Sequence, residues 1–511
     1  MFSKVYSSST HGIDAFLVEV ETHFDMQLSQ FTIVGLPDNA VKESRDRVTA
    51  AIKNSGLEFP RRKITINLAP ADIKKEGSAY DLPIAIGILA ASKIVKEDKL
   101  SNIIFLGELS LDGNLRKVKG ALPVAVQAKK DKMSLIVPTE SVKEASIVEG
   151  LNVFAAENLN EVVNFLNGNL DLKPVKSDLN EIFSRINTYQ LDFSDVKGQE
   201  NVKRALEIAA AGAHNILMIG PPGSGKTMLA KRFPSILPPL TFDEALETTK
   251  IHSIAGLIPS NTALITERPF RNPHHTISDA ALIGGGTFPK PGEVSFAHHG
   301  VLFLDELPEF KKNVLEVMRQ PLEDAKVTVS RSKMSLVFPA NFMLAAAMNP
   351  CPCGYFTDPT KTCTCTPPQI QKYMAKISGP LLDRIDIHIE VPAVNFKELS
   401  SHAMEEESSK IRERVVKARM VQLERFKNKN NIFNNADMGT SEVREYCQLD
   451  QESSDLLKMA MSKLGLSARA YDRILKVSRT IADLENEKNI LPQHISEAIQ
   501  YRSLDRELWN H

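Results

Sequence analysis

The sequence of 511 residues predicts an α/β protein with two α/β units and a C-terminal helical domain. Short apolar runs alternate with helical patterns over residues 1–168 and again over residues 196–392. A polar stretch at 169–195 separates the two units and is typical of a linker. Residues 393–511 carry charged amphipathic patterns without a convincing strand, which indicates a small helical domain.

Apolar runs bounded by turn residues predict the strands of both α/β units. In the first unit these runs are Thr65–Pro70, Ile103–Leu109 and Ser134–Pro138, and helical spacing covers Asn39–Ser55 and Asp81–Ser92. In the second unit the runs NILMIG, VLFLDE and FMLAAAMN are each followed by loop or helix signals. This alternation is expected for a parallel sheet.

The composition is ordinary for a soluble globular protein, with 42% hydrophobic and 24% charged residues. The net charge of -1 does not by itself support a nucleic-acid surface, so any such surface would be local. No run approaches the roughly 20 apolar residues of a membrane span, and the N-terminus has no apolar secretory signal. Five cysteines do not predict a disulfide scaffold. We therefore expect a cytoplasmic protein that does not engage a membrane.

The segment GPPGSGKT follows an apolar run directly and precedes a helical pattern. It matches the phosphate-binding loop G-x-x-x-x-G-K-[ST] in the strand–loop–helix setting that this motif requires. Its glycines let backbone N–H groups converge on phosphates at the positive end of the helix. Lys226 is expected to neutralise the β- and γ-phosphates of ATP, and Thr227 to offer its hydroxyl to Mg²⁺. The predicted cofactor-binding residues are Gly220, Pro221, Pro222, Gly223, Ser224, Gly225, Lys226 and Thr227.

Polar residues end the next two predicted strands. VLFLDE delivers two carboxylates, and ligands bind at the carboxyl ends of strands in an open α/β sheet. We expect Asp305 to hold the Mg²⁺ shell and Glu306 to polarise the attacking water. Asn349 ends the run FMLAAAMN and could orient that water or sense the γ-phosphate. The alternative for Asn349 is turn chemistry, because Asn-Pro is a turn signal.

Arginines could complete the site, because a guanidinium stabilises the charge that spreads over a transferring phosphoryl group. Arg384 lies in SGPLLDRID and is expected to reach a neighbouring subunit's phosphates, which demands an oligomer, most often a ring of six. Arg469 opens a helix in the C-terminal domain and is expected to face nucleotide. Arg319, in MRQPLED, is a rival to Arg384. A surface salt bridge is the alternative for both Arg384 and Arg469.

The order GPPGSGKT, FRNPHHTISDAALIGGG, PGEVSFAHHGVLFLDE, RQPLED, FPANF, AAAMNPCPCG and SGPLLDRID resembles the magnesium-chelatase-like AAA+ ATPases of the ComM/YifB family over essentially the whole chain. The resemblance implies a cytosolic homo-hexameric ring that uses ATP to drive branch migration of single-stranded and branched DNA. It implies a role in homologous recombination and natural transformation. It also implies the roles given above for the nucleotide-site residues.

The first unit resembles the non-ATPase domain of Lon-type proteases, a fold of the ribosomal S5 domain 2 type. Proteolysis would need a Ser–Lys dyad, and here KKEGSAYDLPIA places Tyr80 or Asp81 near the position of the serine. Ser78 and Lys119 lie close to the two family motifs but out of register. We therefore expect a non-proteolytic scaffold or DNA-binding ring.

Four cysteines follow Asn349 closely, in the pattern C-x-C-x9-C-x-C. In a cytosolic protein such a cluster suggests a tetrahedral thiolate site for structural Zn²⁺, although C-x-C is tighter than the usual C-x2-C. The alternative is a loop of reduced thiols kept for packing. The candidate ligands are Cys351, Cys353, Cys363 and Cys365.

Two segments could touch DNA. Lys326–Pro339 predicts a β-hairpin with Arg331 and Lys333 at or near its tip, where the alternative is a solvated turn. Gly284–Gly286, with Lys290 nearby, suggests a second mobile loop. The competing function is a chelatase-type motor that remodels a protein partner without DNA. The paired histidines at 274–275 and 298–299 are expected to be structural.

Overall fold

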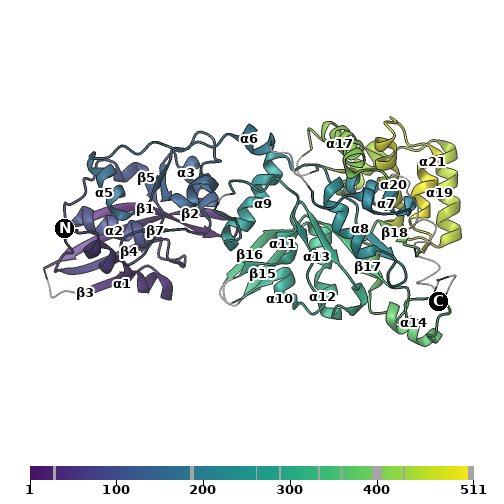
Figure 1. Cartoon of the computed structure of the whole chain (residues 1–511), viewed down its shortest axis with the longest axis horizontal. Coiled ribbons are helices and arrows are strands. Elements are labelled where there is room, and N and C mark those ends of the chain that lie inside the picture. Colours follow the sequence, from purple (N-terminus) through teal and green to yellow (C-terminus); the bar gives the residue numbers. More distant parts are fainter. Residues whose placement is uncertain are drawn as a thin grey trace. The chain divides into compact units, whose positions relative to one another are not determined.

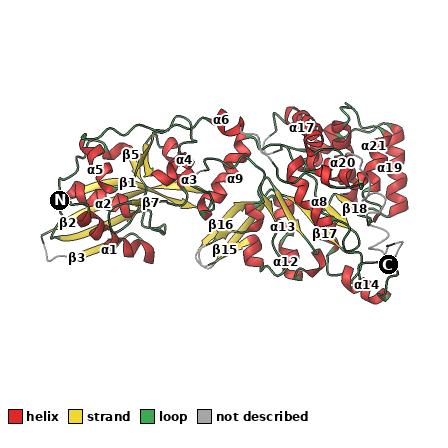
Figure 2. Cartoon of the chain, in the orientation of Figure 1, coloured by secondary structure: helices red, strands yellow, loops and turns green. Residues whose placement is uncertain are grey.

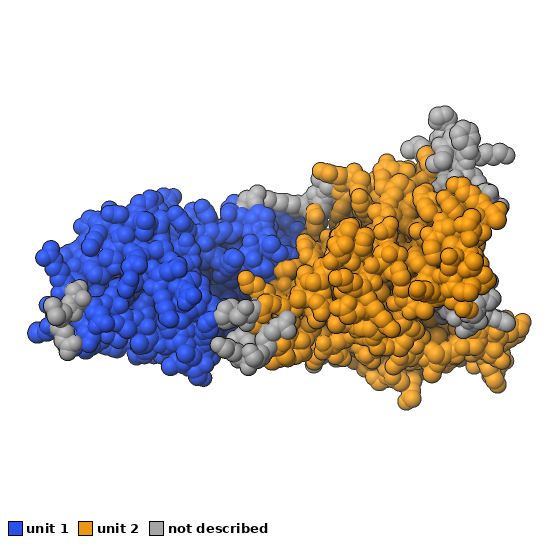
Figure 3. All heavy atoms as spheres, turned by 90° about the horizontal axis from the view of Figure 1, so that it is seen from below, with its two compact units in different colours: residues 1–186, 242–266 blue, residues 187–241, 267–511 orange. Residues whose placement is uncertain are grey.

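The structure, a computed structural model, describes residues 1–26, 30–184, 189–260, 262–286, 289–331, 334–356, 358, 361–393, 405–429 and 432–504. Two compact units divide the chain (Figure 3). Unit 1 comprises Met1–Ile186 and Phe242–Thr266, and unit 2 comprises Asn187–Thr241 and Glu267–His511. Unit 1 is therefore discontinuous in sequence, because a segment from within the second predicted α/β region belongs to it. None of the described helices is both long and apolar enough to cross a membrane.

Unit 1 is built on a seven-stranded sheet with the order β3-β4-β2-β1-β5-β8-β9 (Figure 1). The three strands and two helices predicted from the sequence appear as β4, β5, β8, α1 and α2. The N-terminal antiparallel pair β1–β2 was not predicted from the sequence, and the Ser-rich β1 lacks a clear apolar run. The strands are β1 (Phe2–His11), β2 (Asp14–Asp25), β3 (Gln30–Val34), β4 (Lys63–Ala69), β5 (Ile103–Phe105), β6 (Glu108–Leu109), β7 (Leu115–Arg116), β8 (Ser134–Pro138) and β9 (Val153–Ala156).

Helices cover the sheet of unit 1 and share its apolar core. Every residue of α2 is buried, which explains why its sequence is apolar all round. Helix α9 packs against α3, and Leu246 of α9 contacts the core cluster that contains Leu122. The helices are α1 (Asn39–Asn54), α2 (Asp81–Ala91), α3 (Ala121–Lys130), α4 (Thr139–Ala145), α5 (Leu159–Asn167), α6 (Leu179–Ser184) and α9 (Phe242–Ala255).

Unit 2 contains a parallel five-stranded sheet with the order β11-β14-β17-β10-β18. The predicted runs NILMIG, VLFLDE and FMLAAAMN form its three central strands. Strands β10, β14 and β17 are buried throughout, as expected for a parallel sheet covered on both faces. The strands are β10 (Ile216–Ile219), β11 (Phe270–Arg271), β14 (Val301–Leu304), β17 (Met343–Met348) and β18 (Ile387–Glu390), with hairpins β12 (Gly284–Gly285), β13 (Lys290–Pro291), β15 (Lys326–Arg331) and β16 (Met334–Pro339).

The C-terminal helices share one apolar core with this sheet. Helices α17 and α20 pack against α7, and Val415 and Ile474 belong to the same cluster as Ile216. The described residues after 405 contain helices and no strand, as predicted. The helices of unit 2 are α7 (Glu200–Gly212), α8 (Lys226–Arg232), α10 (Asp279–Ile283), α11 (Glu293–Phe296), α12 (Lys312–Val317), α13 (Arg319–Asp324), α14 (Pro367–Met374), α15 (Gly379–Leu382), α17 (Ser408–Arg425), α18 (Thr440–Tyr446), α19 (Gln451–Leu464), α20 (Ala468–Leu484) and α21 (Pro492–Gln500).

Candidate active site

The phosphate-binding loop connects β10 to α8. Gly223 and Gly225 have φ angles of 79° and 90°, which a residue with a side chain adopts only at a cost. Lys226 is buried at the first position of α8, and its Nζ donates to the carbonyl oxygens of Gly220 (2.7 Å) and Pro221 (2.8 Å). Burial lowers the pKa of Lys226 to about 8. The loop therefore has the shape and the cation that a triphosphate requires.

The two residues expected to share Mg²⁺ contact each other. Thr227 Oγ1 donates to Asp305 Oδ2 across 2.6 Å, although 78 residues separate them in sequence. Parallel pairing causes this contact, because the carboxyl ends of β10, β17 and β14 lie at one edge of the sheet. A hydroxyl and a carboxylate are hard oxygen ligands of the kind that Mg²⁺ prefers, so the pair fits this ion.

Asn349 lies at the same edge, directly after β17. Ile219 pairs with Met348, and the backbone N–H of Gly220 donates to the Met348 carbonyl oxygen across 3.2 Å. The side chain of Asn349 accepts from Lys226 Nζ at 3.3 Å. Asn349 is thus in contact with the group expected to hold the γ-phosphate, which is the position that a sensing or water-orienting amide needs.

Glu306 follows Asp305 with a φ angle of 53°, and its side chain is 60% exposed. His275 Nδ1 lies 3.6 Å from Glu306 Oε2, a contact that was not predicted from the sequence. The sequence did contain a signal for this contact. His274 and His275 follow β11, and β11 pairs with β14, the strand that Asp305 and Glu306 follow. In contrast, His298 is buried and its Nδ1 accepts from the backbone N–H of Asn341 at 3.0 Å, which is a structural role.

Arg384 lies at the amino end of the parallel strands, whereas the phosphate loop lies at their carboxyl end. It precedes β18, where Ile387 pairs with Ile216 at the start of β10. Its side chain is 10% exposed, pairs with Glu323 of α13, and donates to the carbonyl oxygen of Pro380 at 2.6 Å. The length of strand β10 therefore lies between the Arg384 backbone and the loop that starts at Gly220.

Three arginines gather around Glu323. The hydrogen bond from Arg384 lowers the pKa of Glu323, and the nearby charges of Arg469 and Arg319 add to this effect. Arg469 is 60% exposed at the start of α20, with Nη1 3.9 Å from Asp383 Oδ2. Arg319 pairs with Glu316 at 2.5 Å. Arg319, expected as a rival to Arg384, therefore lies in one group with Arg384 and Arg469.

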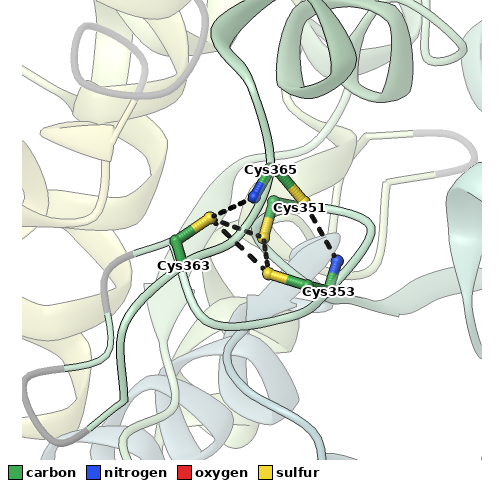
Figure 4. A group of neighbouring side chains, drawn as sticks. All are labelled: Cys351, Cys353, Cys363 and Cys365. Carbon is green, nitrogen blue, oxygen red and sulfur yellow. Dashed lines mark hydrogen bonds between the residues drawn. The ribbon is translucent and has the colours of Figure 1, made fainter.

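The four clustered cysteines have the geometry of a tetrahedral thiolate site (Figure 4). Their Sγ atoms lie within 4.8 Å of one another, and the shorter separations are 3.3, 3.5 and 3.7 Å. A Zn–S bond of about 2.3 Å gives tetrahedral S···S distances of about 3.8 Å. A backbone hydrogen bond at Tyr355 lowers the pKa of Cys353 to about 5, whereas burial raises that of Cys351 to about 12. The donor set fits Zn²⁺, and its four members are Cys351, Cys353, Cys363 and Cys365.

The predicted hairpin is present as β15 and β16 (Figure 2). Arg331 is the last residue of β15, paired with Met334, whereas Lys333 lies outside the described residues. The segment Gly284–Gly286 begins a second hairpin, β12–β13, in which Lys290 is exposed. A Cβ atom on Gly284 would lie 3.2 Å from Val329 Cγ2, so the two hairpins are in contact.

In unit 1, Ser78 and Lys119 have different surroundings. Ser78 Oγ donates to the carboxylate of Glu108. The aliphatic part of Lys119 lies so close to Gly256 that a Cβ atom there would be 2.7 Å from Lys119 Cε. These contacts give Ser78 an acid as its partner rather than the lysine that a Ser–Lys protease would use.

Three family models match successive parts of the chain. Residues 192–399 match the family described as magnesium chelatase, subunit ChlI. Residues 20–141 match subunit ChlI of Mg-chelatase, and residues 405–502 match the C-terminal part of ChlI. The chain is 47% identical over 508 residues to competence protein ComM of Haemophilus influenzae, covering 98% of this chain and 97% of that protein. It is 45% identical to YifB of Escherichia coli, covering 99% of this chain and 97% of that protein.

The chain belongs to the ComM/YifB family of magnesium-chelatase-like AAA+ proteins. A further match, 32% identical over 149 residues, is to Lon protease 2 of Bacillus subtilis and covers 26% of each chain. The expected fold of a Lon-like α/β part, an AAA+ core and C-terminal helices is thus confirmed. Membership of the ComM/YifB family supports ATPase activity.

Proposed function

We propose that this protein is an ATP-driven DNA motor that acts as a homo-hexameric ring in the cytoplasm. One observation carries the proposal. The phosphate loop lies at the carboxyl end of the parallel strands of one sheet, and Arg384 lies at their amino end. An isolated chain therefore has the groups to bind ATP but not the arginine to complete hydrolysis. In a closed ring, the surface of one subunit that carries Arg384 faces the phosphate loop of the next subunit. Every site is then completed by a neighbour.

In this mechanism Lys226 and the loop N–H groups bind the triphosphate, and Asn349 orients the γ-phosphate and the attacking water. Glu306 takes the proton of that water. Thr227 and Asp305 would hold Mg²⁺, which neutralises phosphate charge when it is bound. Arg384 and Arg469, from the neighbouring subunit, stabilise the charge that develops in the transition state.

The two adjacent hairpins are the proposed DNA contacts. Arg331 ends strand β15 of one hairpin, Lys333 follows it in sequence, and Lys290 belongs to the other hairpin. Cations on such hairpins in a ring would contact backbone phosphates without reading sequence. This fits a translocase that moves single-stranded and branched DNA, with a role in recombination and natural transformation. The name of the ComM relative, a competence protein, agrees with this role.

The cysteine cluster would hold Zn²⁺ in a structural role, because four protein thiolates leave no open position for catalysis. Unit 1 would serve as a non-proteolytic scaffold, since Ser78 bonds to Glu108.

A second candidate is a chelatase-type motor that remodels a protein partner. The ChlI matches over three parts of the chain favour it. It requires the same ATP site but assigns no role to cations at the hairpin tips.

The deciding experiment measures ATP hydrolysis with and without single-stranded and four-way-branched DNA, and follows strand displacement in the same reactions. A DNA motor is stimulated by DNA and moves the junction, and Lys226→Ala abolishes both. The double variant Arg331→Ala, Lys333→Ala should retain basal hydrolysis and lose the stimulation. Robust hydrolysis that is indifferent to every DNA would reject the proposal and favour the protein-remodelling motor.

A further inference from the structure

The cysteine cluster is attached directly to the nucleotide site at three places. We define the cysteine loop as residues 351–354 and 363–365. We propose that this loop, when closed by a metal ion, holds the phosphate-binding loop and Asn349 in place, so that metal occupancy sets the affinity for nucleotide. The inference rests on the proposed ATP site and on the proposed metal at the thiolates, and it adds a means of control to that site.

The first attachment is through the backbone after β17. Asn349 accepts a hydrogen bond from Lys226 Nζ at 3.3 Å, and Cys351, two residues later, is fully buried. Only Pro350 separates the two, and a proline restricts the backbone on both sides. A displacement of Cys351 therefore moves Asn349 and the oxygen that contacts Lys226.

The second attachment is a direct contact with the phosphate loop. Gly354 is buried with a φ angle of 86°, and a Cβ atom on it would lie 2.4 Å from Pro222 Cδ. The two loops thus approach more closely than any residue with a side chain would permit. The same Gly354 donates its backbone N–H toward Cys351 Sγ at 3.2 Å. One residue therefore contacts both a metal ligand and the phosphate loop.

The third attachment returns from the other end of the cluster. Cys365 directly precedes Thr366, which is the N-cap residue of α14. The backbone N–H of Thr366 donates to Gln369 Oε1 at 2.9 Å. Helix α14 carries the buried Tyr373, whose pKa is raised by burial, while the nearby backbone of Asn349 opposes that rise. Both halves of the cysteine loop are thus connected to Asn349, and a metal ion bound between the halves would join them to each other.

This arrangement makes the thiolates a support for the site. The two halves of the cysteine loop meet at their sulfur atoms, where Cys351 Sγ lies 3.7 Å from Cys363 Sγ and the backbone N–H of Cys353 donates to Cys365 Sγ at 3.4 Å. Hydrogen bonds to or from sulfur are weak, so a bound metal ion would be the strongest link between the two halves. A loop held loosely lets Gly354 move away from Pro222. Because binding geometry is sensitive to displacements of about 1 Å, we expect the effect in nucleotide affinity itself.

The test uses the full-length protein and the double variant Cys363→Ser, Cys365→Ser. Zinc content is measured by atomic absorption, affinity by titration with a fluorescent ATP analogue, and folding by circular dichroism. We expect the variant to lose zinc and to bind the analogue about tenfold more weakly. The matched control is Cys447→Ala, because Cys447 is a buried cysteine outside the cluster. It should retain zinc and affinity.

Gly354→Ala separates metal binding from its consequence, because it retains all four thiols and adds a methyl group against Pro222. We expect it to bind zinc and to have weakened affinity. This variant carries the test if the double variant does not fold. Loss of zinc with unchanged affinity, or a wild-type protein that takes up no zinc, would overturn the inference while leaving the ATP site intact. A zinc-loaded wild-type protein that binds no nucleotide would refute the proposed function, and the inference with it.

Discussion

The side-chain amide of Asn215 donates to the carbonyl oxygen of Arg384 at 2.9 Å, while its own oxygen accepts from the backbone N–H of Leu344 at 2.8 Å. Asn215 directly precedes β10, so this amide fixes Arg384 to the amino end of the strand whose other end carries the phosphate loop. The separation of Arg384 from Lys226 is therefore built into the sheet.

This separation predicts complementation between subunits. Arg384→Ala should lower ATP hydrolysis by about 10³-fold, as for loss of an arginine finger. Glu306→Gln should lower it to a similar extent. Mixing the two inactive variants should restore part of the activity, because some interfaces then combine an intact Arg384 with an intact Glu306. Mixtures as inactive as the separate variants would show that Arg384 serves its own subunit.

The buried amine of Lys226 predicts a pH dependence of nucleotide affinity. Its pKa is lowered to about 8, and bound phosphates would raise it. Below pH 8 the amine is already protonated and the affinity should be level. Above pH 8 binding must take up a proton, so the affinity should fall by up to about tenfold per pH unit.

Titration with an ATP analogue between pH 6.5 and about 9.5 measures this effect. Lys226→Arg is the control, because a guanidinium stays charged throughout this range. Its affinity is expected to change less with pH than that of the wild type. An equal decline in both proteins would assign the effect to another group.

The contact of His275 with Glu306 predicts a change in turnover without a change in binding. His275→Asn should lower kcat severalfold and leave the affinity for an ATP analogue unchanged, because only the orientation of the proposed base is altered. In the Glu306→Gln background the same substitution should have no further effect. Additive losses would show that His275 acts independently of Glu306.

A buried polar network predicts that stability depends on Asp386. Its carboxylate pairs with Arg473 and lies 3.1 Å from Nδ1 of the fully buried His214, whose Nε2 lies 2.8 Å from Thr480 Oγ1. Asp386→Asn removes the charge that faces Arg473, so the free energy of unfolding should fall by about 3 kcal/mol. Denaturant unfolding of unit 2 measures this loss. Lys417→Ala, which breaks an exposed pair with Glu413, should cause no measurable change.

The sequence predicted those parts of the site in which local pattern and strand order act together. A strand–loop–helix motif and two polar strand ends were enough to place Lys226, Thr227, Asp305 and Asn349 together, because parallel strands share their carboxyl edge. The contact between Gly354 and Pro222 could not be predicted, since it depends on how two loops pack. The grouping of Arg319 with Arg384 also required the tertiary structure, because α13 and β18 are remote in sequence.

The sequence also gave no signal that α9 belongs with unit 1. In sequence α9 follows α8 closely, so it would be expected to belong to unit 2 like α8. Only its packing against α3 shows that it belongs to unit 1. Periodicity reports that a face is apolar, but it does not report which partner covers that face.

The discontinuity of unit 1 has a consequence for dissection of the protein. The chain passes between the units at residues 186–187, 241–242 and 266–267, so three covalent crossings connect them. A fragment that begins at residue 187 would still contain α9 and would expose the face that α3 covers. A clean excision must also replace residues 242–266 with a short linker from the end of Thr241 to Glu267. Limited proteolysis at a single crossing should leave both units tethered, and a nicked protein should migrate as one particle until it is denatured.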